Sequence, residues 1–151
     1  MRRGNYGRFL LMLLISFLVM YCVMYANVVS EQHIYISLNR FYMTILMVMP
    51  MAVIMLLFMK DMYRSTTKNN IIIVLGIASF IGAFILLRTQ TYIDDVNYMK
   101  SMIPHHSSAI LSSQEANLND PEVKELSKQI IESQEREIKQ MKEMINRLEN
   151  E

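Results

Sequence analysis

Three long apolar stretches fill the first part of the chain. No charged residue interrupts the ranges 9–29, 41–59 and 71–87, which hold 21, 19 and 17 residues. A helix rises about 1.5 Å per residue and the hydrocarbon layer of a bilayer is about 30 Å thick, so each stretch can cross a membrane, the third one barely. The pattern predicts a membrane domain over residues 1–90 with three transmembrane helices.

After the third stretch, charged residues return and the apolar residues become periodic. On a helix over residues 94–116 the apolar residues share one side, which predicts an amphipathic helix. A short connection at 117–119 is followed by Asp120, a good N-cap, and by Pro121, which suits the first helical position. A second amphipathic helix follows. Residues 91–151 are therefore predicted to form an antiparallel helical hairpin.

The predicted hairpin has more apolar surface than two helices can bury against each other. A second copy is the simplest partner, because two hairpins complete a four-helix bundle. We therefore expect an all-α chain in which half of such a bundle follows the membrane helices, and a dimer or higher homo-oligomer. A diiron oxidase bundle is excluded because it needs Glu-x-x-His on a helix, whereas Met102 stands three residues before His105.

Basic residues alternate between rich and poor connections, and this alternation predicts the orientation in the membrane. Loops rich in lysine and arginine stay in the cytoplasm. The N-terminus is therefore expected in the cytoplasm, and the hairpin outside it, in a multi-pass protein of the cell membrane. The basic residues are Arg2, Arg3 and Arg8 before the first stretch, Arg40 in the first loop, Lys60, Arg64 and Lys68 in the second loop, and Arg88 and Lys100 after the third stretch.

The remaining composition excludes several classes of function. The formal net charge is +1, so the chain has no basic footprint for nucleic acid. The single cysteine, Cys22, lies in the first apolar stretch and cannot form an intramolecular disulfide. No nucleophile–base pair, hydrolytic zinc motif or paired acid–base carboxylates stand out, so we do not expect an enzyme.

The segment from Tyr98 to His106 concentrates metal-binding side chains. It contains two methionines and two of the chain's three histidines. On a helix, Met99, Met102 and His106 share one face within about 60° of arc, and His105 sits at its edge. Thioethers and imidazoles favour soft copper(I), and by the same argument silver(I), over hard cations. The alternative is that the methionines fill core space and a buried histidine finds a hydrogen-bond partner.

The second hairpin helix has two polar residues in the middle of its apolar stripe, Gln134 and Glu137. Buried polar groups need partners, and the facing helix is the nearest source of them. Counting outward from the turn places His106 roughly opposite residues 131–134. We therefore expect Gln134 or Glu137 to support the candidate metal site as a partner of His106.

The same count brings methionines of both helices to one level. Met102 is expected near Glu137, and Met99 near Met141. Met144 could contribute a thioether one turn further out. The coincidence of polar residues and methionines on two facing helices favours a built site over chance placement.

Other features of the chain carry weaker signals. His33, in the first loop, is expected to be solvated, and Ala78 and Gly82 have the spacing that lets membrane helices approach closely. A row of methionines in the second apolar stretch could either fill gaps between helices or relay soft metal ions, and packing is favoured because no histidine or carboxylate accompanies it. The row is Met43, Met47, Met51, Met55 and Met59.

The hairpin sequence resembles a known family through two sets of residues. The first is Asp95-x-x-Tyr98-Met99-x-x-Met102-Ile103-Pro104-His105-His106-x-x-Ala109-Ile110. The second is Asp120-Pro121-x-Val123 with Ile130-Ile131-x-x-Gln134-x-x-Glu137-Ile138-x-x-Met141. Together they resemble the family called domain of unknown function 305, over about residues 94–148.

This resemblance implies a helical, ferritin-like domain, and some family members are secreted copper- or silver-binding proteins implicated in metal tolerance. The chain departs from the family at Ser112 and Ser113, where members often have a methionine. The departure implies a lower capacity or affinity for metal. By position, the resemblance implies metal ligands at Met99, Met102, His105, His106 and Met141, and possibly at Met144.

Three functions of different classes follow from these observations. The favoured one is a membrane-anchored, extracytoplasmic copper(I) or silver(I) binder that buffers the metal or hands it to a copper transporter or chaperone. The second is a structural or sensory membrane module whose His-His motif is a satisfied polar core. The third is a bundle that binds haem non-covalently through one histidine and one methionine, since no Cys-x-x-Cys-His motif is present.

Overall fold

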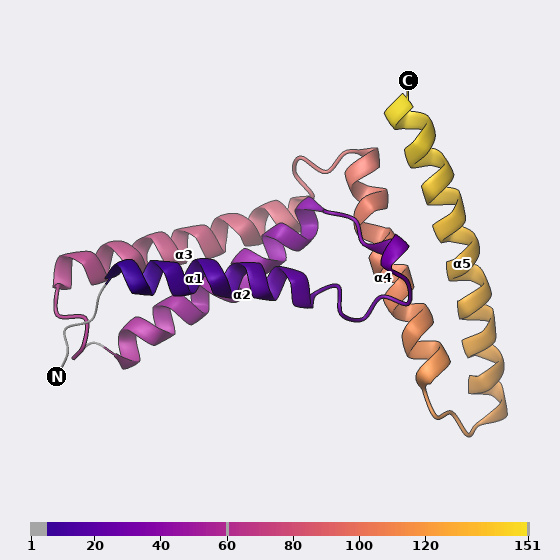
Figure 1. The fold of residues 1–151 in the computed structure, drawn as a ribbon, viewed down its shortest axis with the longest axis horizontal. Coiled ribbons are helices and arrows are strands. Elements are labelled where there is room, and N and C mark those ends of the chain that lie inside the picture. Colours follow the sequence, from indigo (N-terminus) through magenta and orange to yellow (C-terminus); the bar gives the residue numbers. More distant parts are fainter. Residues whose placement is uncertain (1–5, 60, 151) are drawn as a thin grey trace. The chain divides into compact units, whose positions relative to one another are not determined.

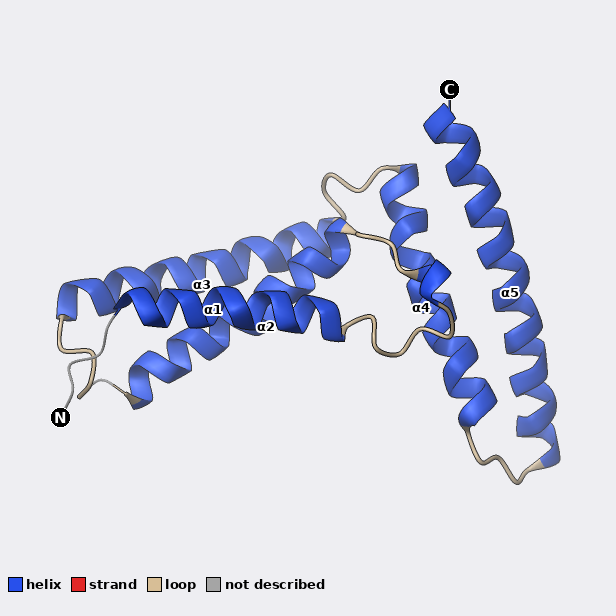
Figure 2. Ribbon diagram, viewed as in Figure 1, coloured by secondary structure: helices blue, strands red, loops and turns tan. Residues whose placement is uncertain are grey.

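The computed structural model describes residues 6–59 and 61–150, and every regular element in these ranges is helical (Figure 1, Figure 2). The prediction of an all-α chain is thus confirmed for the described residues. Arg2, Arg3 and Lys60, which contributed to the predicted orientation, lie outside them. The elements are α1 (Tyr6–Val23), the short 3-10 helix η1 (Glu31–His33), α2 (Leu38–Phe58), α3 (Thr66–Thr89), α4 (Asp95–Glu115) and α5 (Pro121–Asn150).

The chain separates into two compact units. One unit combines α1 with α2 and α3, and the other combines α4 and α5 with the segment Met24–Leu38, called the linker below. The linker includes η1 and connects α1 to α2. The sequence interpretation had grouped the linker with the membrane helices, because its position in the chain gives no sign of where it binds.

The helices α1, α2 and α3 are each long and apolar enough to cross a membrane, as predicted. The largest differences between their bounds and the apolar stretches are the end of α1 and the start of α3. The first helix ends at Val23 rather than at residue 29, because the following residues form the linker. The third helix begins at Thr66, where the Ser65 hydroxyl caps it by accepting a hydrogen bond from the Lys68 backbone N–H.

Apolar packing holds the membrane unit together. Phe9, Ala52, Leu56 and Tyr63 form its buried core. The close approach of α3 to α2 occurs at Gly76, where an added Cβ would lie 3.0 Å from a methyl carbon of Val53. Glycine at this point allows the close approach, because a Cβ here would require the Val53 side chain to shift.

The expected small-residue contact at Ala78 and Gly82 is not made within the membrane unit. Ala78 is exposed, and no atom of the described residues lies within 4 Å of a Cβ added at Gly82. Ala83 is buried instead, on the side of α3 that also carries Gly76. Gly76 and Ala83 are seven residues apart, close to two helical turns, so they share one face.

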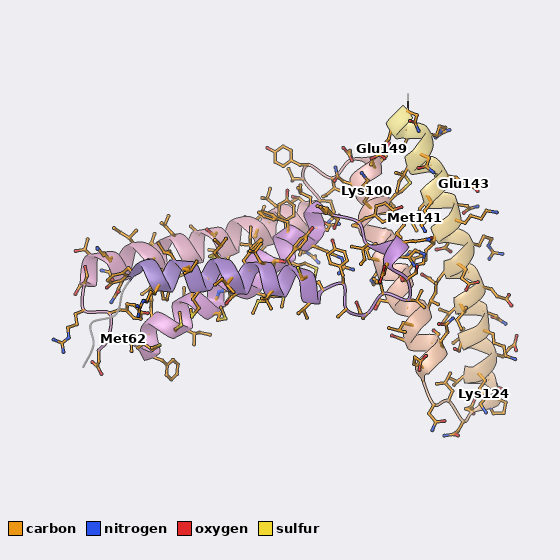
Figure 3. The ribbon with its side chains drawn as sticks, in the orientation of Figure 1. Met62, Lys100, Lys124, Met141, Glu143 and Glu149 are labelled. Carbon is orange, nitrogen blue, oxygen red and sulfur yellow. The ribbon has the colours of Figure 1, made fainter. Side chains whose placement is uncertain are left out.

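In the second unit, α4 and α5 pack against each other around buried isoleucines and Met99. Aspartates cap both helices: Asp94 accepts from the Asn97 backbone N–H, and the predicted cap Asp120 accepts from those of Glu122 and Val123. Residues with increasing numbers on α4 contact residues with decreasing numbers on α5, so the two helices are antiparallel. The hydrogen bonds that establish this order join Lys100 to Glu149 (Figure 3), His106 to Glu137, and Ser113 to Ser127.

Candidate metal centre

His106 lies at the middle of the hairpin and is 8% exposed. Its Nδ1 is 3.0 Å from the backbone oxygen of Met102, one turn earlier on α4. Its Nε2 is 2.7 Å from Oε2 of Glu137 on α5. The count from the turn had placed Met102 near Glu137, and the structure places His106 itself against that carboxylate.

Both partners of the His106 ring are hydrogen-bond acceptors. A backbone carbonyl accepts only, and an ionised carboxylate accepts only. The two hydrogen bonds therefore form together when both ring nitrogens carry protons. A neutral ring, which carries one proton, can donate to only one of these two acceptors at a time.

Glu137 is held in its ionised form by two donors. The Ser133 hydroxyl, at 2.9 Å from Oε1, and then the hydrogen bond from His106 hold the pKa of Glu137 below its usual range. The carboxylate side chain is nevertheless 45% exposed. Glu137 therefore connects a buried imidazole to the surface of the hairpin.

The methionines divide between the core and the surface of the hairpin. Met99 is 6% exposed and belongs to the buried cluster of the hairpin, against which Met141 packs (Figure 3). Met102 is half-buried, and its backbone carbonyl is the one that holds His106. The structure thus brings Met99 and Met141 into one cluster, as the sequence predicted, and places Met102 within one turn of the His106 ring.

Three of the other predicted site residues do not join this cluster. His105 is exposed, with its ring centre 6.2 Å from that of His106. Met144 is 48% exposed on the surface of α5. Gln134 is half-buried one turn before Glu137, and the partner of His106 is Glu137. Within residues 6–59 and 61–150, no three side chains of His, Cys, Asp or Glu converge as a metal-binding group.

The linker adds a histidine that sequence reasoning had set aside. Nδ1 of His33 lies 2.9 Å from Oγ of Ser107, a fully buried hydroxyl on α4 that also accepts from the Val29 backbone N–H at 2.8 Å. Burial, and then the positive charge of Lys142 on α5, lower the pKa of His33. His33 was expected to be solvated, and this expectation is wrong. Ser107, which directly follows the His-His motif, was the residue from which a polar contact with another segment could have been expected.

The methionine row of α2 has a different setting. Met43 and Met47 are 43% and 47% exposed, whereas Met55 and Met59 pack against the core around Phe9. The buried stripe of α2 lies one residue further along, at positions that include Val48. Packing within the chain therefore explains only the second half of the row.

Comparisons with known proteins agree on the C-terminal part of the chain. A family model described as "Domain of unknown function (DUF305)" matches residues 87–150. An uncharacterized protein of Acanthamoeba polyphaga mimivirus is 37% identical over 147 residues, which cover 94% of this chain and 93% of that protein. No solved structure matches the chain.

Proposed function

The chain belongs to the family of the domain of unknown function DUF305, and on that premise we propose that it is a membrane-anchored binding protein for copper(I) or silver(I). The hairpin holds the metal outside the cytoplasm, and it either buffers the ion or passes it to a copper transporter or chaperone. The observation that carries this proposal is the hydrogen bond between the buried His106 ring and Glu137, with methionines of both helices in the adjacent turns.

The side chains at His106 suit a soft ion once a proton leaves. A metal ion at Nε2 takes the place of the proton that His106 shares with Glu137, since ligands must be deprotonated to bind metal. Nδ1–H still donates to the Met102 carbonyl, which fixes the orientation of the ring. Met99, Met102 and Met141 stand within two turns of the pair along α4 and α5, and their thioethers favour copper(I) and silver(I) over zinc.

The orientation in the membrane follows from the basic flanks. Arg8 lies in the first turn of α1, Arg64 stands between α2 and α3, and Lys68 lies in the first turn of α3, so these ends are assigned to the cytoplasm. The hairpin then faces the extracytoplasmic side of the cell membrane. A reporter fused to the C-terminus tests this assignment: it is expected to be active only outside the cytoplasm, and activity only inside would contradict it.

We also propose that two hairpins assemble into a ferritin-like four-helix bundle. The linker covers part of α4, yet Leu126 of α5 stays 54% exposed and Val123 stays 44% exposed. Exposed aliphatic residues on the apolar side of an amphipathic helix favour association with a further helix pair. Light scattering of the purified full chain at micromolar concentration is expected to give at least a dimer, and a stable monomer would refute this assembly.

One observation favours a second candidate, a structural or sensory module without metal chemistry. The His106 ring already has a partner at each nitrogen, and its hydrogen bonds are complete without any ion. Such a pair can serve only to specify how α4 and α5 align. The two candidates differ in one property: the module has no affinity for soft metal ions beyond that of any exposed methionine.

A competition titration separates these candidates. The purified full chain competes with a chromophoric chelator for copper(I), and in parallel experiments for silver(I) and zinc. The binding protein is expected to remove copper(I) and silver(I) from the chelator and to bind zinc far more weakly. Failure to remove either soft ion would favour the module, and preferential zinc binding would overturn the assigned ligand set.

A further inference from the structure

The hairpin has one side covered by the linker and one side that carries the His106–Glu137 pair. The linker binds at Ser107, which follows His106 by about 100° around α4. Lys142 lies near the linker histidine His33, so the linker side of the hairpin includes that part of α5. Glu137 is 45% exposed on the side that carries the His106–Glu137 pair, and we call this side the open face.

Exposed apolar side chains border the pair on the open face. On α5, Val123, Leu126 and Met144 lie within about 60° of arc around the helix, and Glu137 lies in the same arc. On α4, Tyr98 lies within about 80° of His106. The exposed fractions are 44% for Val123, 54% for Leu126, 48% for Met144 and 52% for Tyr98.

Apolar positions of α5 are arranged symmetrically about one point of the helix, and this arrangement favours a second copy of the chain as the partner that binds the open face. Val123 and Met144 are equally far along the chain from the point just after Ser133, and so are Leu126 and Met141. If a second α5 ran antiparallel with a two-fold axis at this point, each methionine would meet an aliphatic side chain of the other copy. A self-complementary surface of this kind is what a two-fold interface requires.

The same axis brings the His106 side chains of two copies together. The contacts of His106 with Glu137 and of Ser113 with Ser127 bracket Ser133 on the facing helix. The axis therefore crosses α4 between His106 and Ser113, near Ala109, whose small side chain is half-buried. A small residue at the axis allows two copies of α4 to approach closely.

We propose that a second copy of the chain docks antiparallel on the open face, and that the two copies share one soft-metal centre with His106 of each as a ligand. This inference rests on the metal binding proposed above. A single chain offers the imidazole of His106 and the thioether of Met102, which stands one turn earlier on α4. The second copy doubles both ligands and covers the exposed carboxylate of Glu137.

Cross-linking in the membrane tests the docking. Ser133→Cys, in a chain whose native cysteine is removed by Cys22→Ala, places a thiol at the proposed axis, where a short thiol-reactive linker joins the two copies. Glu132→Cys is the matched control, because Glu132 is exposed and one residue away, about 100° around α5. Ser133→Cys is expected to give mostly dimer and Glu132→Cys mostly monomer. Equal yields, or monomer from both, would overturn the docking.

The shared centre is tested by the stoichiometry of silver(I). The Cys22→Ala chain without an added thiol is titrated, and one ion per two chains is expected. One ion per chain would overturn the sharing while the proposed function stands. Selective cross-linking without any silver(I) binding would overturn both the shared centre and the proposed function.

Discussion

Both units of this protein contain several methionines, yet only the methionines of the hairpin have a buried histidine beside them. Four methionines of α2 and Met59 just after it follow each other at intervals of four residues, and the helix contains no histidine or carboxylate. In the hairpin, thioethers accompany a buried imidazole that is paired with a carboxylate. The number of methionines therefore does not locate a metal site. The proposed function takes the buried nitrogen beside the methionines as the mark of the site.

Removal of this ligand is expected to have the largest effect. His106→Ala should weaken copper(I) binding by about 100-fold or more, because even partners outside the ligand shell commonly contribute 10–100-fold to metal affinity. The matched control is His105→Ala, whose exposed side chain should matter less. Chelator competition measures both variants. Equal losses of copper(I) affinity in the two variants would indicate that His105 is also a ligand.

The hairpin unit should also depend on polar contacts for its stability more than the membrane unit does. Ser107→Ala removes the buried acceptor of the Val29 N–H and the partner of His33, and is expected to cost about 1–3 kcal/mol of unfolding free energy. Ser108→Ala removes an exposed contact with Asn27 and should cost about 0.5 kcal/mol or less. Denaturant titration that monitors the unfolding of the hairpin measures the unfolding free energy of both variants. Equal costs would show that the linker is not anchored at Ser107.

Acid should weaken the hairpin through Glu137. Its pKa is lowered in the fold from a value of 4.5, so the folded state binds fewer protons than the unfolded state in that range. The stabilisation is present above pH 4.5 and is lost as the pH falls through the lowered pKa. Asp94 shifts in the same direction, so the comparison uses Glu137→Gln. The midpoint temperature of thermal unfolding of the wild type should fall toward that of Glu137→Gln as the pH decreases. If the midpoint temperatures of the two proteins changed with pH in parallel, the pairing of Glu137 with His106 would be contradicted.

The helices were largely predictable because their signals are local. Asp120 caps α5 at the predicted position, since an N-cap needs only backbone N–H groups of the next turn. The end of α1 was not predictable from hydropathy. The apolar run continues to Val29, but the Val29 N–H bonds to Ser107, 78 positions further along the chain. Such a tertiary contact leaves no local pattern.

The candidate site was predictable to about one turn. Counting from the loop located the level at which the polar residues of α4 and α5 meet, because antiparallel helices with a short connection have few possible registers. The count did not decide between Gln134 and Glu137 as the partner of His106, since that choice depends on side-chain reach. His33 was missed for a related reason: nothing in a loop sequence indicates which helix the loop binds.

The most direct test of the central claim uses copper(I) competition to compare the methionines of α4 with the methionines of α2. Met99→Leu with Met102→Leu keeps the side-chain volume, so the fold should lose less than about 1.5 kcal/mol. Copper(I) affinity should still fall at least about tenfold, which corresponds to about 1.4 kcal/mol. Met43→Leu with Met47→Leu, on exposed positions of α2, should leave the affinity unchanged. Unchanged affinity in the first pair, or an equal loss in both, would contradict a soft-metal site at His106.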